Sequence, residues 1–149
     1  MRVASNAYGK LDNELGVACA DPHRLISMLF DAAIASVAMA QAHMAARRIA
    51  DKGRAVSRAI RIISEGLRAS LDKDAGGDLA LRLDALYDYM ERRLVEANAR
   101  NDAAIFNEVI GLLNDLAAAW RKAAPTPPPT PASNAARPSA MFTTRALAA

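Results

Sequence analysis

The sequence predicts an all-α protein, and within that class an antiparallel up-down four-helix bundle. Three observations favour this fold. Alanine supplies 35 of the 149 residues, so 52% of the chain is hydrophobic while only 5% is aromatic. Glycine and proline, the two residues with the lowest helix propensity, number only seven each. Between residues 21 and 123, apolar residues recur every three or four positions in four separate runs, which is the spacing of one helix face.

Composition divides the chain into three parts. Residues 1–20 form a short N-terminal arm that contains Gly9 and Gly16 and lacks a clear periodicity. Residues 21–123 carry the four periodic runs, and we expect them to form the bundle domain. Residues 124–149 contain six of the seven prolines and few large apolar side chains. Such a segment cannot offset the entropy of folding, so we expect a disordered C-terminal tail.

The first helix is expected to span Pro22 to Ile49. Asp21 is a suitable N-cap for it, and proline at the first helical position costs nothing because that N–H would have no helical partner. The apolar face of this helix consists of Ile26, Phe30, Ala33, Val37, Ala40 and Met44.

The second helix is expected to begin after a turn at residues 50–53, with Asp51 as its N-cap. Its apolar face consists of Val56, Ile60, Ile63, Leu67 and Leu71. A break from Lys73 to Gly77 follows, because the Gly76-Gly77 pair is a strong turn signal.

The third helix is expected to start with Asp78 as its N-cap, and the fourth to follow Asn101 and Asp102. The apolar face of the third helix consists of Leu79, Leu83, Leu86, Met90, Leu94 and Ala97. That of the fourth consists of Phe106, Val109, Leu113, Leu116 and Trp120. Loops of a few residues connect antiparallel neighbours, so the four helices are expected to alternate in direction.

Charge and cysteine content narrow the class further. The chain up to Lys122 has 17 basic and 16 acidic residues, and a net charge of +1 argues against a dedicated nucleic-acid binder. Cys19 is the single cysteine, which favours a reducing compartment. No uninterrupted apolar run has the length of a membrane span, and the N-terminus has no apolar signal-peptide core. We therefore expect a soluble, cytoplasmic protein that does not insert into membranes.

The sequence contains no motif that indicates catalysis, a cofactor or a metal. His23 and His43 lack cysteine or carboxylate companions at the spacing of metal ligands. Gly-rich phosphate loops, nucleophile elbows and paired catalytic carboxylates are also missing from the sequence. We expect neither an enzyme activity nor a cofactor.

A second apolar stripe lies beside the main face of two helices. On the second helix it consists of Ala55, Ala59, Ile62, Gly66 and Ala69, and on the fourth of Ile105, Leu112 and Ala119. These residues could line a shallow outer groove that receives an amphipathic helix from a partner. Alternatively, they could widen the core face and be buried within the bundle. The pattern alone favours the buried position.

Two other features point towards partners. The second helix region is rich in basic residues, namely Arg47, Arg48, Lys52, Arg54, Arg58, Arg61 and Arg68. These residues could bind an acidic partner or phosphate, or they could form a solvated face that pairs with acidic residues of a neighbouring helix.

Tyr87 and Tyr89 are two positions apart and therefore point to different faces of the third helix. We expect Tyr87 beside the core and Tyr89 on the outside, where it is a candidate partner contact.

Several short motifs, in their order along the chain, resemble the FliS family of flagellar export chaperones. The most specific run is Leu86-Tyr87-Asp88-Tyr89-Met90, followed by Arg92-Arg93-Leu94, Glu96-Ala97-Asn98 and Asn101-Asp102. Around it, in the same order, stand Asn6-Ala7-Tyr8, Ala20-Asp21-Pro22, Gly76-Gly77 and Ala119-Trp120. Phe30 departs from the family pattern, in which tyrosine is usual.

The resemblance implies a chaperone that binds the C-terminal helical segment of flagellin in the cytoplasm. It also implies that the chaperone prevents premature polymerisation and assists delivery to the flagellar type III secretion apparatus, with export-gate or regulatory proteins as possible further partners. The stretch around Tyr8 would cover part of the binding surface when flagellin is absent. The candidate flagellin-binding residues are Tyr8, Ala55, Ala59, Ile62, Gly66, Tyr89, Ile105 and Leu112. The alternative function is a helical regulatory module that binds nucleic acid or an acidic protein through its basic second helix.

Overall fold

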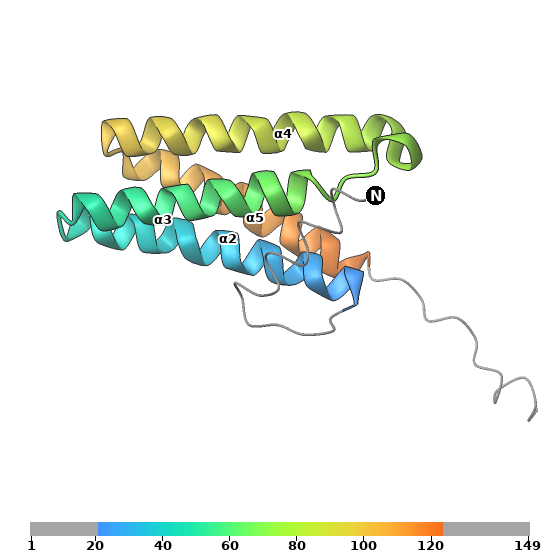
Figure 1. Ribbon diagram of the computed structural model, residues 1–149, viewed down its shortest axis with the longest axis horizontal. Helices are drawn as coiled ribbons and strands as arrows, with labels where there is room; N and C mark the ends of the chain where they lie inside the picture. Colours follow the sequence, from blue (N-terminus) through green and yellow to red (C-terminus); the bar gives the residue numbers. More distant parts are fainter. Residues whose placement is uncertain (1–20, 124–149) are drawn as a thin grey trace, which may run out of the picture.

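The computed structural model describes residues 21–123, which form four helical rods (Figure 1). The helices are α2 (Pro22–Ala45), α3 (Ile49–Arg61), α4 (Lys73–Arg100) and α5 (Ala103–Lys122). A π-helical segment, η1 (Ile62–Arg68), continues α3 without a turn, so α3 and η1 together make one rod. The described range contains no strand, and the predicted all-α class is confirmed.

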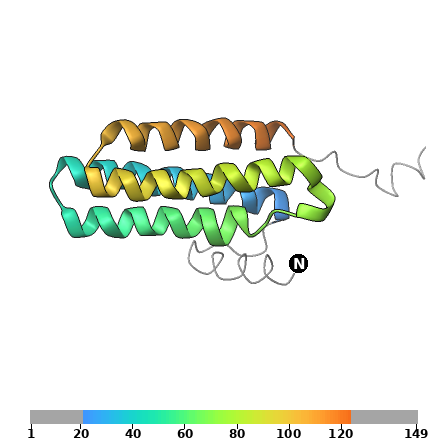
Figure 2. The same cartoon turned by 90° about the horizontal axis from the view of Figure 1, so that it is seen from above.

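The four rods run antiparallel to their chain neighbours and form a bundle. Helix α2 packs against α3 and α5, and α4 packs against α5 and against the α3–η1 rod, so α2 and α4 lie diagonally across the bundle. Figures 1 and 2 show this arrangement from two sides, with the α2–α3 and α4–α5 turns at one end and the η1–α4 loop at the other. The predicted up-down four-helix bundle is therefore confirmed.

The turn between the first two helices differs from the prediction. Helix α2 ends at Ala45 rather than Ile49, because Arg47 adopts a left-handed backbone conformation with φ of 59° that a helix cannot continue through. Helix α3 then begins at Ile49, which places Asp51 inside the first turn instead of at the N-cap. The N-cap residue is Arg48, and no side chain caps this helix.

The predicted break before the third helix exists, but the helical segment begins earlier than expected. Asp72 caps a first turn through hydrogen bonds from the amides of Asp74 and Ala75, and Gly77 then interrupts the helix with φ of 52° and ψ of −129°. Such angles are easily adopted by glycine alone. Asp78 follows the break, so its predicted role as the helix N-cap is wrong. Leu79 is 66% exposed, and its predicted core position is also wrong.

The π-helical segment η1 was not predicted from the sequence. Its wider turn is visible in the hydrogen bond from the amide of Ala69 to the carbonyl of Ser64, five residues earlier, at 3.2 Å. Ile62, Ile63, Gly66 and Leu67 are all buried in this segment.

The core lies along the bundle axis and follows the main predicted faces. The fully buried side chains of large volume come from every rod and include Leu29, Val37, Ile63, Leu67, Met90, Leu94, Phe106, Val109 and Leu113. At the end of the bundle, His23 stacks on Trp120 with ring centroids 4.7 Å apart. The indole N–H of Trp120 donates to the carbonyl of His23 at 2.8 Å, so the start of α2 is tied to the end of α5.

Candidate partner-binding surface

The outer face of α2 is apolar although it is open to solvent. Ala35, Ala38, Met39 and Ala42 follow each other at helical spacing, and all four are exposed, Met39 by 54%. Only 44% of the most apolar 18-residue window of α2 is buried. A run of neighbouring exposed apolar residues on one helix face is a candidate surface for binding another protein.

Helix α2 also has the length and composition of a membrane span, contrary to the expectation that no segment of the chain does. Core helices of soluble proteins can have the same length and apolar composition. Leu29, Ala33 and Val37 on the inner face of α2 are completely buried in the bundle core. The packing of α2 in the bundle therefore accounts for its apolar inner face.

Most of the predicted groove residues are buried. Ala55, Ala59 and Ile62 belong to the hydrophobic core with exposures of 7%, 0% and 1%, and Ile105 is 5% exposed. Gly66 is buried in η1, while Leu112 is half-buried against the core. For these buried residues the position that the pattern favoured is confirmed, because the bundle uses them to widen its core, and an outer-face position is wrong. Ala69 is half-buried and Ala119 is exposed. Contact of these residues with a partner stays a prediction, and Tyr8 lies outside the described residues.

The two tyrosines of the LYDYM run have different environments, as predicted. Tyr87 is 4% exposed, and this burial raises the pKa of its hydroxyl to about 12. Tyr89 is 38% exposed, and its hydroxyl donates to Glu108 of α5 at 2.6 Å. The hydrogen bond to Glu108 raises the pKa of Tyr89. Tyr89 therefore stands at the open α4–α5 surface with its hydroxyl held in place.

Arg93 completes this surface network. Its Nε donates to Glu108 at 2.8 Å, its Nη1 donates to Glu96 at 2.6 Å, and its guanidinium lies 6.0 Å from the centre of the Tyr89 ring. Hydrogen bonds from Tyr89, and secondly from Arg93, lower the pKa of Glu108. The side chains Tyr89, Arg93 and Glu108 thus join α4 to α5 and give Tyr89 a fixed orientation.

Arg68 is one of the basic residues for which the sequence left two roles open, binding a partner or pairing with acidic residues of a neighbouring helix. Its guanidinium forms ion pairs with Asp84 at 2.7 Å, Asp88 at 3.3 Å and Glu91 at 3.2 Å, all on α4. The hydrogen bond from Arg68 lowers the pKa of Asp84, whereas burial raises the pKa of Glu91. For Arg68, pairing with acidic residues of a neighbouring helix is confirmed.

The described residues offer surfaces for binding another molecule. Among residues 21–123 there is no group of three histidine, cysteine, aspartate or glutamate side chains that could hold a metal ion. The strongest sequence signal for the exposed face of α2 was the series of small residues on an already apolar helix. That signal does not distinguish exposed alanines from buried ones, so Ala35, Ala38 and Ala42 were not among the candidate residues.

A four-helix bundle with an uncovered apolar helix face defines a class of helical binding proteins. The comparisons with known proteins give the family. The chain matches the family described as "Flagellar protein FliS" over residues 4–127. It is 46% identical over 119 residues to the flagellar secretion chaperone FliS of Salmonella typhimurium, covering 80% of this chain and 88% of that protein.

Two further relatives agree. The chain is 42% identical over 117 residues to the flagellar secretion chaperone FliSB of Pseudomonas aeruginosa, covering 78% of this chain and 92% of that protein. It is 38% identical over 123 residues to the flagellar secretion chaperone FliS of Escherichia coli, covering 83% and 90%. The chain therefore belongs to the FliS family, a family of flagellar secretion chaperones and not of enzymes.

Proposed function

We propose that this protein binds the C-terminal helical segment of flagellin in the cytoplasm. By doing so it prevents premature polymerisation of flagellin and assists its delivery to the flagellar type III secretion apparatus. The observation that carries the proposal is the exposed apolar face of α2 in a member of a secretion chaperone family. An amphipathic flagellin helix would bury its own apolar face against such a surface.

The surface suits a segment that has to be released again. Ala35, Ala38 and Ala42 present short, exposed apolar side chains, and alanine loses no rotamer entropy on binding. A disordered segment that folds on binding spends part of the interaction free energy on its own ordering, which limits the affinity. Reversible capture is the expected result.

Tyr89 and Leu112 are further proposed contacts at the α4–α5 side. Tyr89 presents part of its ring to solvent while its hydroxyl is occupied by Glu108, and Leu112 is half-buried. Tyr8 keeps its proposed role of covering part of the surface in the absence of flagellin. The buried residues Ala55 and Ile62 would contribute to binding indirectly, by setting the distance between the helices that carry the surface.

The decisive experiment compares two forms of flagellin in a binding assay such as isothermal titration calorimetry. Full-length flagellin should bind, and flagellin without its C-terminal segment should bind at least tenfold more weakly. Equal binding of the two forms would refute the proposal.

A matched pair of variants locates the surface. Met39→Asp places a charge on the α2 face, where it should weaken flagellin binding by about tenfold because a carboxylate loses water at an apolar interface. Leu81→Asp is the control, since Leu81 is 56% exposed on α4 and Met39 54% exposed on α2. Thermal unfolding should be the same for both variants. Equal losses of binding in the two variants would show that the α2 face is not the contact.

A further inference from the structure

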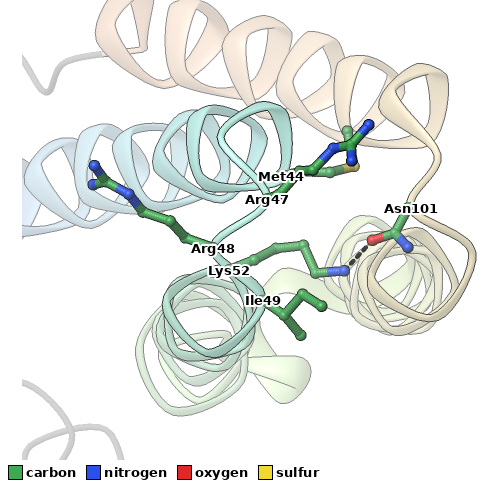
Figure 3. A pocket seen from close by; sticks show the side chains of 6 residues that line it. All are labelled: Met44, Arg47, Arg48, Ile49, Lys52 and Asn101. Atoms are coloured by element: carbon green, nitrogen blue, oxygen red, sulfur yellow. Dashed lines mark hydrogen bonds between the residues drawn. The ribbon is translucent and has the colours of Figure 1, made fainter.

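A cavity of about 320 Å³ lies at the α2–α3 turn, beside the end of α4, and neither the core nor the apolar α2 face includes it. We call it the turn notch. Figure 3 shows the side chains that line it, namely Met44, Arg47, Arg48, Ile49, Lys52 and Asn101. Three of these six residues are cationic and none is acidic.

The positive charge of the turn notch is not neutralised by the bundle. Within residues 21–123, neither arginine of the notch nor Lys52 forms an ion pair with a carboxylate within 4.0 Å. Asp51 is close by, but its carboxylate is paired with Arg54. Arg68, at the other end of the same rod, pairs with three carboxylates. Among the described residues, the cations of the turn notch thus have no carboxylate at ion-pair distance, and Arg48 interacts with Asp51 only at longer range.

Lys52 forms the floor of the turn notch. It is only 4% exposed, and its ammonium group donates to the carbonyl of Asn98 at 2.9 Å and to the side-chain oxygen of Asn101. Both acceptors are formally neutral, and the end of α4 at which they lie supplies only the partial negative charge of a helix C-terminus. A buried ammonium without a counter-charge is costly, and a nearby anion would reduce this cost.

The first residues of α3 favour an anion in the same place. Asp21, Asp72 and Asp102 cap the other three helices with carboxylate oxygens, whereas Arg48 occupies the N-cap of α3 and no side chain caps it. A carboxylate supplied from outside would interact favourably with this helix start. This contribution adds to that of the cations lining the notch.

The shape of the turn notch favours a peptide over a single compact anion. Figure 3 shows the Arg48 side chain pointing away from Lys52, so the cations are spread around the turn instead of converging on one point. Ile49 is 75% exposed and lies on the other side of Lys52 from the two arginines (Figure 3), and Met44 adds a half-buried apolar wall. Carboxylates spaced along a peptide can reach the separated cations while an apolar side chain of the same peptide covers Ile49.

We propose that the turn notch is a second docking site for an acidic segment of a partner protein. It is distinct from the exposed apolar face of α2. The segment carries an apolar side chain flanked by aspartate or glutamate residues. The apolar side chain packs on Ile49 and Met44, and the flanking carboxylates pair with Arg47 and Arg48.

The test uses the full-length chain without flagellin and a peptide with fluorescein on its N-terminal amine, fluoresceinyl-Asp-Glu-Leu-Asp-Asp-Leu-Glu-Asp-amide, in a fluorescence anisotropy titration. The double variant Arg47→Gln/Arg48→Gln should bind the peptide about tenfold more weakly at low salt, because two surface ion pairs are lost. Ile49→Ser should weaken it by about threefold through lost apolar contact. Affinity of the unmodified chain should fall as salt is raised.

Two matched controls should bind like the unmodified chain. Arg82→Gln/Arg92→Gln removes the same charge from α4, where both arginines are mostly exposed, and Val95→Ser removes an exposed β-branched residue from the same helix. Equal losses in the control and notch variants would overturn the proposal, because net charge alone would then explain binding.

Other results would also overturn it. If a peptide with serine in place of both leucines binds equally, and inorganic phosphate displaces it, the notch is a simple anion site. If the chain self-associates and Arg47→Gln/Arg48→Gln abolishes this, the occupant is a second copy, whose exposed Leu79 and Leu81 follow Asp78. Because flagellin is absent from the assay, none of these results bears on flagellin binding.

Discussion

Replacement of Ile62 by alanine tests whether the second apolar stripe belongs to the core or to a partner surface. Ile62 is 1% exposed and lies in the π-helical segment η1 among the core residues. Ile→Ala at a buried site removes several apolar carbons and leaves a cavity, which costs about 3 kcal/mol. For a domain of this size, we expect a fall in melting temperature of about 12 °C or more.

The measurement is urea unfolding followed by far-UV circular dichroism, with the free energy of unfolding extrapolated to water. Ile49→Ala is a matched control, because the same side chain is shortened at a position that is 75% exposed. Its free energy of unfolding should change by less than about 0.5 kcal/mol. If Ile62→Ala behaved like Ile49→Ala but lost flagellin binding, the stripe would be a binding groove and its assignment to the core would fail.

Three further substitutions test other contacts. Arg68→Met should lower the free energy of unfolding by about 2 kcal/mol in urea, because it breaks three ion pairs and leaves their carboxylates together; an unchanged value would show that the cluster contributes nothing. Glu108→Gln concerns a carboxyl with a lowered pKa, whose stabilisation is present above its unfolded value of about 4.5 and is lost as pH falls through the folded pKa. Thermal unfolding should therefore depend less steeply on pH below about 4.5 in this variant, and identical pH profiles would contradict the role of Glu108. Gly77→Ala should destabilise by about 1 kcal/mol because φ is 52°, whereas Gly111→Ala, within helix α5 and with equal free space, should stabilise slightly; the same sign for both would refute this argument.

The main core faces were predictable because large aliphatic residues repeat with helical spacing. Leu67, Met90, Leu94, Val109 and Leu113 are all buried where the spacing placed them. Leu79 is the exception. Its position continues the spacing, but Leu79 is 66% exposed while the next residue, Ala80, is buried. The spacing alone does not show which face of the turn after Gly77 is covered.

The helix ends could be predicted only where the capping residue lies within a few positions of the amides that it caps. Asp21 and Asp102 cap their helices as expected, since a carboxylate two or three residues before an amide needs no distant partner. The turn at Arg47 was misplaced by a few residues, because no glycine or asparagine marks the left-handed position there. The π-helical segment η1 could not be predicted either, since no residue pattern in the sequence indicates its wider turn.

Alanine explains why the fold was easier to predict than the site. Ala33, Ala40 and Ala59 are completely buried, where a small side chain lets helix axes approach closely. Ala35 and Ala38 are exposed on α2, where the same side chain leaves a flat apolar face that loses no rotamer entropy when a partner covers it. Both positions have the same residue and nearly the same spacing, so the sequence cannot separate them. The packing of α2 against α3 and α5 decides which alanines stabilise the bundle and which remain exposed to a partner.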